Sequence, residues 1–402
     1  MPRLRANLDF MPSPDPDRPG LLIRDAYRYS DATLIIPPAL VECLRCFDGE
    51  LTELDLRAEL VRITGDLNVS ELERNIIDTL AGAGFLEDEN YARMREERHL
   101  QFAGEPRREA THSGSAYPDE PVALRETLGG WMNGGNGNGT KRLMGIAAPH
   151  VSPEGGWKSY QAAYSALKPE YKDRTFVVLG TSHYGESERF GLTRKPFVTP
   201  LGESAVDLPL VNKLAGEAAD SIVMEDYCHS IEHSIEFQVL FLQYCYGPDI
   251  RILPILCGSF ARSIYGGGAP EKDEKVRRFL GALGELATRE GDRLFWVLGI
   301  DMAHMGRRYG DHFAAHAGRG EMERVAERDS LRIDRINAGD AGGFWDLVQE
   351  RHDDLKWCGS SPLYTFLKVA PEARGELNHY EQWNIDEQSV VSFAGISFSK
   401  EA

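Results

Sequence analysis

The stretch Phe176–Gly185, FVVLGTSHYG, decides how this chain of 402 residues folds. Phe176–Leu179 is a short, continuous apolar run, which is typical of a strand buried on both faces of a sheet. Gly180 and the small residues after it let the backbone turn tightly, so His183 is predicted to lie on the loop at the carboxyl end of this strand. Ligands of open parallel sheets bind at that edge, and His183 is therefore a candidate binding residue.

Three other stretches repeat this order of apolar strand, small residues and ligand-type side chain. They are Leu143–His150 (LMGIAAPH), Leu294–His304 (LFWVLGIDMAH) and, with a weaker strand, Leu355–Cys358 (LKWC). We expect the four strand ends to converge on one metal ion, because ligands gather at this edge of a parallel sheet. Imidazole suits iron, copper, nickel and zinc, so the pattern predicts a metal site without naming a reaction. Unrelated loop histidines with local hydrogen bonds are the alternative for each residue taken singly.

Composition limits the classes of function. The formal net charge of −18 argues against nucleic acid or an anionic membrane as the main partner. The N-terminus lacks an apolar signal core, and no stretch approaches 18 apolar residues, so a cytoplasmic, soluble protein is expected. The six cysteines are scattered along the chain, which suits reduced thiols in a reducing compartment.

Three segments are expected along the chain. Residues 1–92 predict a small α+β module of winged-helix type, 93–110 a charge-dense linker, and 111–402 the larger domain. Within the first module the proline-rich residues 1–20 are expected to be extended or irregular, and Thr52 with Asp55 resembles a capping box that opens a helix. Its remaining predicted elements are strands at 21–28 and 32–36, helices from about 38–47, 52 and 70, and a last β element at 85–86.

The larger domain alternates strands with helices from Leu143 onward. This alternation predicts an α/β fold with a largely parallel sheet flanked by helices. Strands are predicted at 143–148, 175–180, 251–256, 294–299 and 390–397, and helices at about 157–167, 208–219, 233–246, 273–289, 313–335 and 362–369. The stretch 134–139 (GGNGNG) predicts a flexible surface loop or linker.

Asp301 and His304 form D-x-x-H just past an apolar strand. Asp301 is expected either to bind metal directly or to orient a ligating histidine, and His304 either to ligate or to act as an acid or base. Cys358 precedes Gly-Ser-Ser-Pro and a helical pattern, with Ser361 as the predicted N-cap. A thiol beside a helix N-terminus is expected to have its thiolate favoured, which helps metal binding and nucleophilicity.

A second motif overlaps the segment Cys228–Gln238 (CHSIEHSIEFQ). His229, Glu232 and His233 match H-x-x-E-H, a zinc-peptidase signature in which both histidines share one helix face and the glutamate acts as base. Short motifs of this kind arise by chance, and the peptidase pattern does not explain the four strand ends. His312 and His316 are expected on a solvated helix face, and the C-x-x-C of Cys43 and Cys46 is expected to be buried core.

Six ordered motifs together resemble the Memo family, which supplies protein B of AmmeMemoRadiSam systems. They are SAYP (115–118), APH (148–150), LGTSHYG (179–185), EHSIEFQ (232–238), D-x-x-H-x-G (301–306) and CGSSP (358–362). The resemblance implies a fold like that of class III extradiol ring-cleaving dioxygenases. It implies His150, His183 and Cys358 as metal ligands, with Asp301 and His304 beside them. Glu232 and His233 would line or support the pocket.

The chain departs from the dioxygenases in one ligand. Those enzymes hold iron with two histidines and a carboxylate, whereas the third ligand here is expected to be the Cys358 thiolate. A thiolate is softer and oxidisable, so iron or copper is expected, and ring cleavage does not follow from the fold. After His150 the chain reads Val-Ser-Pro-Glu, where family members usually place small and aromatic residues, which puts the pocket wall in doubt.

Residues 20–90 resemble PqqD-like peptide-recognition domains, through RDAYRYSDATLIIPPALVECLRCFDGE and two short helices. This implies a peptide or partner enzyme as ligand of the first module. The system's name implies a radical-SAM enzyme and an AMMECR1-like protein as partners. The leading hypothesis is thus a Memo-like metalloprotein with redox or oxygen-linked chemistry on a small molecule or modified peptide. A non-catalytic peptide- or phosphopeptide-binding adaptor and a metal-dependent hydrolase are the alternatives.

Overall fold

The computed structural model describes residues 1–134 and 141–400. The chain divides into two compact units, Met1–Gly104 and Glu105–Ala402, and each is considered by itself. Residues 135–139, part of the glycine-rich stretch predicted as a linker, lie outside the described residues. Within the described ranges, no helix is both long and apolar enough to cross a membrane.

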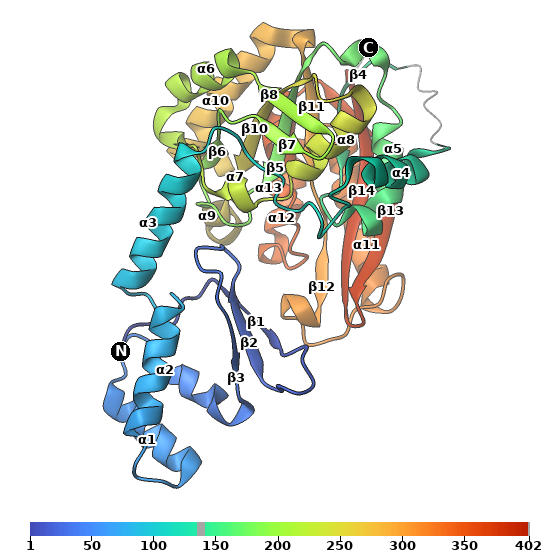
Figure 1. Ribbon diagram of the computed structural model, residues 1–402. Coiled ribbons are helices and arrows are strands. Elements are labelled where there is room, and N and C mark those ends of the chain that lie inside the picture. The colour runs from blue at the N-terminus through green and yellow to red at the C-terminus, as the bar shows by residue number, and fades with distance from the viewer. Residues whose placement is uncertain (135–140, 401–402) are drawn as a thin grey trace. The chain divides into compact units, whose positions relative to one another are not determined.

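The first unit contains a small antiparallel sheet with helices (Figure 1). Its elements are β1 (Leu8–Pro12), β2 (Leu21–Asp25), β3 (Thr33–Ile36), a 3-10 helix (Pro38–Cys46), α1 (Glu53–Thr64), α2 (Ser70–Gly82) and α3 (Glu89–Gly104). The sheet order is β1-β2-β3. Residues 1–20, predicted to be extended or irregular, include the extended strand β1, which pairs along β2 and keeps its proline at the strand end, where no ladder hydrogen bond is lost.

The capping box at the start of α1 is confirmed. The Asp55 carboxylate accepts a hydrogen bond from the Thr52 backbone N–H at 2.8 Å. Cys43 and Cys46 are both buried in the core of this unit, and burial raises the pKa of the Cys43 thiol to about 11. Their burial agrees with the predicted core role.

The second unit is an α/β domain. Its strands are β4 (Leu143–Ala148), β5 (Thr175–Thr181), β6 (Phe190–Leu192), β7 (Phe197–Thr199), β8 (Gly202–Val206), β9 (Ile222–Met224), β10 (Arg251–Cys257), β11 (Leu294–Gly299), β12 (His304–Gly306), β13 (Ala373–Asp386) and β14 (Ser389–Lys400). Its helices are α4 (Pro121–Met132), α5 (Pro153–Tyr164), α6 (Leu208–Ala218), α7 (Cys228–Ile231), α8 (Glu236–Tyr246), α9 (Ala261–Gly266), α10 (Glu274–Glu290), α11 (Glu321–Asn337), α12 (Ala341–Gln349) and α13 (Ser360–Val369).

The large sheet has a parallel centre and antiparallel edges. Its order is β12-β14-β4-β11-β5-β10-β6-β9, and β4, β11, β5 and β10 are mutually parallel neighbours. β14 joins β4 antiparallel, and β6 joins β10 antiparallel. The predicted α/β class is confirmed, and all five predicted strands are present as β4, β5, β10, β11 and β14.

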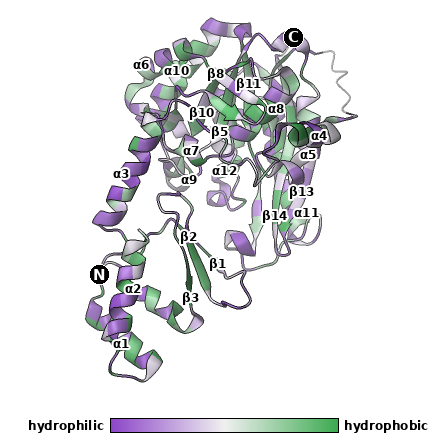
Figure 2. Ribbon diagram, in the orientation of Figure 1, coloured by the Kyte–Doolittle hydropathy of each residue, from purple (hydrophilic) through white to green (hydrophobic). Residues whose placement is uncertain are grey.

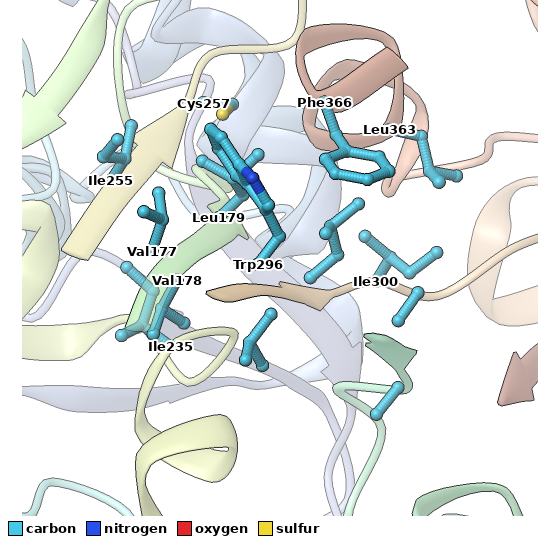
Figure 3. Close-up of a cluster of buried hydrophobic side chains, with 14 of the residues drawn as sticks. Val177, Val178, Leu179, Ile235, Ile255, Cys257, Trp296, Ile300, Leu363 and Phe366 are labelled. Carbon is cyan, nitrogen blue, oxygen red and sulfur yellow. The ribbon is translucent and has the colours of Figure 1, made fainter. Parts of the chain in front are cut away.

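Helices cover both faces of this sheet (Figure 1). α5 and α8 pack on one face, whereas α13, supported by α10 and α12, packs on the other. Every residue of β4, β5 and β11 is buried, as their continuous apolar runs predicted. Figure 3 shows Phe366 of α13 beside Trp296 of β11, and the centroids of these two rings lie 5.6 Å apart.

Hydropathy follows the same layers in Figure 2, where apolar colour marks the inner strands and α3 is mostly hydrophilic.

Two predicted helices start later than expected. The helix predicted at 313–335 begins at Glu321, so His312 and His316 lie on a loop and not on a helix face. The helix predicted at 233–246 begins at Glu236, because the chain is extended at Glu232.

Candidate metal centre

His150 reaches the centre from the loop that follows β4. Its side chain is buried, and its Nδ1 lies 2.9 Å from the Gly299 carbonyl oxygen, so Nδ1 carries a hydrogen and donates it. The lone pair of this ring is therefore on Nε2. Burial, with the neighbouring rings of His183 and His233, holds the pKa of His150 well below its ordinary value. His150 is thus a neutral imidazole that presents Nε2 as a ligand atom.

His183 follows β5, as its sequence position predicted, and Glu232 orients its ring. The Nδ1 of His183 lies 3.0 and 3.1 Å from the two Glu232 carboxylate oxygens, and the His183 backbone N–H donates to the same carboxylate at 2.9 Å. Burial alone would lower the pKa of His183, but Glu232 raises it well above its ordinary value. A carboxylate behind a ligating imidazole fixes the ring and makes the opposite nitrogen a stronger ligand.

Cys358 completes the group from the turn before α13. Its Sγ lies 3.2 Å from His150 Nε2, and the His183 ring also hydrogen-bonds to the thiol. The Thr181 hydroxyl donates to the Cys358 carbonyl at 3.0 Å, which ties the turn to the end of β5. The ligand atoms of His150, His183 and Cys358 all lie within 4.8 Å of one another. The structure therefore brings together the three residues expected to ligate.

The turn that carries Cys358 fits tightly against β11. A Cβ on Gly359 would lie 2.6 Å from Ile300 Cβ and 2.7 Å from the Asp301 carbonyl oxygen, so only glycine fits here. α13 begins at Ser360 with Gly359 as N-cap, so the prediction of Ser361 as N-cap is wrong by two residues. Burial raises the pKa of the Cys358 thiol, so the expected thiolate is not favoured by the helix N-terminus in the metal-free site.

Asp301 and His304 lie beside this group in different roles. Asp301 Oδ1 accepts from the backbone N–H groups of His150 at 2.9 Å and Val151 at 3.1 Å, so Asp301 holds the loop that carries His150. Its Oδ2 lies 3.6 Å from His150 Nε2. His304 Nδ1 faces the carbonyl oxygens of Met302 and Lys356, and burial lowers its pKa to about 4. Asp301 therefore supports the loop of His150, and neither Asp301 nor His304 joins the three-ligand group among the described residues.

His233 stands over His183. The two rings are parallel, with centroids 5.1 Å apart and planes 7° apart, and His150 meets both rings edge-on. The side chains of His183 and His233 are each 27% exposed, so solvent reaches this side of the centre. Glu232, which lies beneath both rings, is buried. Although burial opposes it, the two histidines hold the pKa of Glu232 well below its ordinary value.

His229 does not join the centre. α7 ends at Ile231 and Glu232 has extended backbone, so His229 and His233 do not share a helix face. His229 Nε2 contacts the Gly191 carbonyl oxygen at 3.0 Å instead. The H-x-x-E-H interpretation therefore lacks the helix on which its chemistry depends.

Arg108 was missed by sequence reasoning because it lies in a charge-dense run that read as linker. It is fully buried, pairs with the buried Glu236 carboxylate, and donates to the carbonyl oxygens of Glu232 at 2.7 Å and His229 at 2.8 Å. Glu236 also accepts from the Tyr117 hydroxyl at 2.5 Å. This network fixes the backbone from which Glu232 and His233 project. A buried arginine gives no periodic signal in a sequence.

The geometry defines a class: an α/β protein with a His/His/Cys centre at the carboxyl edge of its parallel strands. The ligands of one iron, copper or zinc ion lie about 2.0–2.3 Å from it, and therefore about 3–4 Å from each other. The distance of 3.2 Å between Cys358 Sγ and His150 Nε2 fits that range. Both imidazoles also use Nδ1 for a protein acceptor and turn Nε2 inward, as ligating histidines do.

The profile of the Memo-like protein family matches residues 108–397, and the chain belongs to this family. A MEMO1 family protein of Aquifex aeolicus (strain VF5) is 26% identical over 384 residues, which cover 94% of this chain and 95% of that protein. A MEMO1 family protein of Methanosarcina acetivorans is 29% identical over 263 residues, which cover 64% of this chain and 86% of that protein. A crystal structure of an uncharacterized protein from Escherichia coli K12 matches with a TM-score of 0.41 and 12% identity, covering 64% of this chain and 99% of that one.

Proposed function

We propose that this Memo-family protein binds iron or copper through His150, His183 and Cys358 and carries out redox or oxygen-linked chemistry on a small molecule or modified peptide. One observation carries the proposal. Each histidine commits Nδ1 to a protein acceptor, and the remaining nitrogens lie with a thiol in one cluster of ligand atoms. Such preorganisation is characteristic of metal ligands and has no evident purpose in a hydrophobic core.

When bound, iron or copper would supply electron transfer and an open coordination position for a substrate. The thiolate of Cys358 is softer than the carboxylate of extradiol dioxygenases, so it favours copper or shifts the redox behaviour of iron. A ring-cleavage reaction therefore does not follow from the predicted resemblance to those enzymes. The sequence resemblance to that fold stays a prediction.

Four side chains would serve the centre without binding its ion. Glu232 holds the His183 ring, and Asp301 holds the loop of His150. His233 is solvent-accessible above His183 and is placed to exchange a proton with a substrate. Burial lowers the pKa of His304 to about 4, so it is neutral near pH 7 and would act as a proton acceptor. These roles use all four residues that the sequence nominated as catalytic.

The first unit would recognise a peptide or a partner enzyme. Similarity to the Aquifex aeolicus protein extends over 94% of this chain, so both units recur together in that relative. This supports a two-part protein in which Met1–Gly104 recruits and Glu105–Ala402 reacts. A radical-SAM enzyme and an AMMECR1-like protein are the partners that the family resemblance implies.

Metal analysis of anaerobically purified full-length protein tests the proposal. We expect iron or copper near one equivalent in the wild type and its loss in His183→Ala and Cys358→Ser, with content retained in His312→Ala, which removes an exposed loop histidine. Unchanged metal in both site variants would refute the centre and leave the non-catalytic adaptor as the better account. Oxygen uptake with catechols then separates ring cleavage from other redox chemistry.

A further inference from the structure

A second group of donor atoms overlaps the proposed centre. One ring nitrogen each of His183 and His233 and a carboxylate oxygen of Glu232 lie within 4.8 Å of one another. Glu232 Oε1 is 3.0 Å from His183 Nδ1 and 3.2 Å from His233 Nδ1. Two imidazoles and one carboxylate form the ligand set of many non-haem iron sites.

We propose that these three residues form an alternative binding site for a hard divalent cation, which shares His183 with the softer thiolate centre. The inference rests on the proposed function, because it reuses His183. The two sites use opposite nitrogens of that ring, Nε2 toward Cys358 and Nδ1 toward Glu232. One neutral imidazole has a single lone pair, so the two sites exclude each other.

The distances fit a metal as well as they fit hydrogen bonds. With bonds of about 2.1 Å, two donors 3.0–3.2 Å apart subtend about 95° at the ion. This is close to the right angle between facial ligands of an octahedral cation. The parallel rings of His183 and His233, 7° apart, aim their Nδ1 atoms at the same carboxylate oxygen. Moving each ring hydrogen from Nδ1 to Nε2 would turn both lone pairs toward that oxygen.

The charge around Glu232 favours a cation. Its carboxylate is buried, and within residues 1–134 and 141–400 it forms ion pairs with His183 and His233 but with no lysine or arginine. The buried Arg108 donates to the Glu232 carbonyl oxygen, but its ion pair is with the Glu236 carboxylate. The side chains of both histidines are 27% exposed, so an ion has a path from solvent.

Donor chemistry would select between the two sites. Nitrogen and carboxylate oxygen suit Fe(II), Mn(II) and Zn(II), whereas thiolate with two imidazoles suits softer ions such as Cu(I). The chain would therefore hold one kind of metal or the other, depending on which ring nitrogen of His183 binds it. His233 is the residue that distinguishes the hard site, because it is not one of the three ligands of the thiolate centre.

Mn(II) is the probe for the test, because the paramagnetic resonance signal of free Mn(II) falls when it binds. Metal-free full-length protein would be titrated as Cys358→Ser, as Cys358→Ser with His233→Ala, and as Cys358→Ser with His312→Ala. We expect the first and third to bind one Mn(II) with equal affinity, and the second to bind at least tenfold more weakly. Far-UV circular dichroism checks that each variant is folded.

Two results would overturn the inference. One is loss of Mn(II) binding in Cys358→Ser itself, and the other is equal binding in the His233→Ala and His312→Ala variants. Cu(I) titration of the wild type and Cys358→Ser tests the thiolate centre separately. Cu(I) binding could prove equal in the wild type and Cys358→Ser while Mn(II) binding depends on His233. That result would reject the proposed function and keep the hard site.

Discussion

The buried Arg108–Glu236 pair offers the sharpest stability test, through the substitution Arg108→Met. Both side chains are fully buried, and Arg108 also donates to the carbonyl oxygens of Glu109, His229 and Glu232. Methionine keeps the volume but leaves the Glu236 carboxylate without its cation. Breaking a buried ion pair from one side costs about 3–5 kcal/mol, because the remaining charge is uncompensated.

Urea unfolding measured by tryptophan fluorescence isolates this effect. All six tryptophans lie after residue 104, so the signal reports the second unit alone. With a urea dependence of about 3 kcal/mol/M, a loss of 3–5 kcal/mol lowers the midpoint by about 1–1.7 M. The matched control is Arg107→Met, whose side chain is 52% exposed and pairs with an exposed Glu109. That substitution should cost less than about 0.5 kcal/mol.

The stability that the Arg108–Glu236 pair contributes depends on pH with a definite sign. Although burial opposes it, Arg108 holds the pKa of Glu236 below its ordinary value of 4.5. The pair therefore stabilises the fold fully above that value, and the contribution is lost as pH falls through the lowered pKa. In Arg108→Met, burial instead raises the Glu236 pKa, so the penalty should shrink between pH 7 and pH 5. A loss below about 1 kcal/mol, or one that is the same at both pH values, would refute the reasoning.

Three further changes test the site and its support. Glu232→Gln should weaken iron or copper binding about 10- to 100-fold in competition with a chromophoric chelator, because His183 loses its carboxylate partner; unchanged affinity would contradict that role. Gly359→Ala should cost about 1–3 kcal/mol in urea and reduce bound metal, since its Cβ would meet β11 at 2.6 Å; a fully stable, metal-replete variant would contradict the tight fit. Arg351→Gly should stabilise the second unit by about 0.5 kcal/mol, because a positive φ of 59° suits glycine; Arg351→Ala, which keeps the strain, is the control and should show no gain.

The parallel centre of the fold was predictable because its strands are buried on both faces. Their sequences are unbroken apolar runs, and the small residues that follow mark where each strand ends. His150 and His183 could be nominated for the same reason. The long hairpin strand β13 was missed, since its exposed face mixes charges and polar residues that read as loop.

What the sequence did not reveal depends on contacts between distant segments. Arg108 looks like a solvated charge until the fold places it beneath Glu232 and Glu236. The left-handed backbone at Arg351, His352 and Asp353 is adopted without any glycine, so no glycine signalled the turn before Cys358. Burial raises the pKa of the Cys358 thiol, which is opposite to the direction expected from its place beside a helix.

The three proposed ligands are held by two different parts of the fold. His150 and His183 follow β4 and β5, which flank β11, and Asp301 follows β11 between them, so the sheet itself fixes the spacing of the imidazoles. Cys358 comes from the turn before α13, whose position depends on helix packing and on Gly359. A small shift of α13 would therefore move the soft ligand while leaving the imidazoles and Glu232 in place. We therefore expect the balance between the proposed thiolate centre and the proposed carboxylate site to depend on the packing of α13, and changes confined to this helix should alter which metal binds before they alter whether one binds.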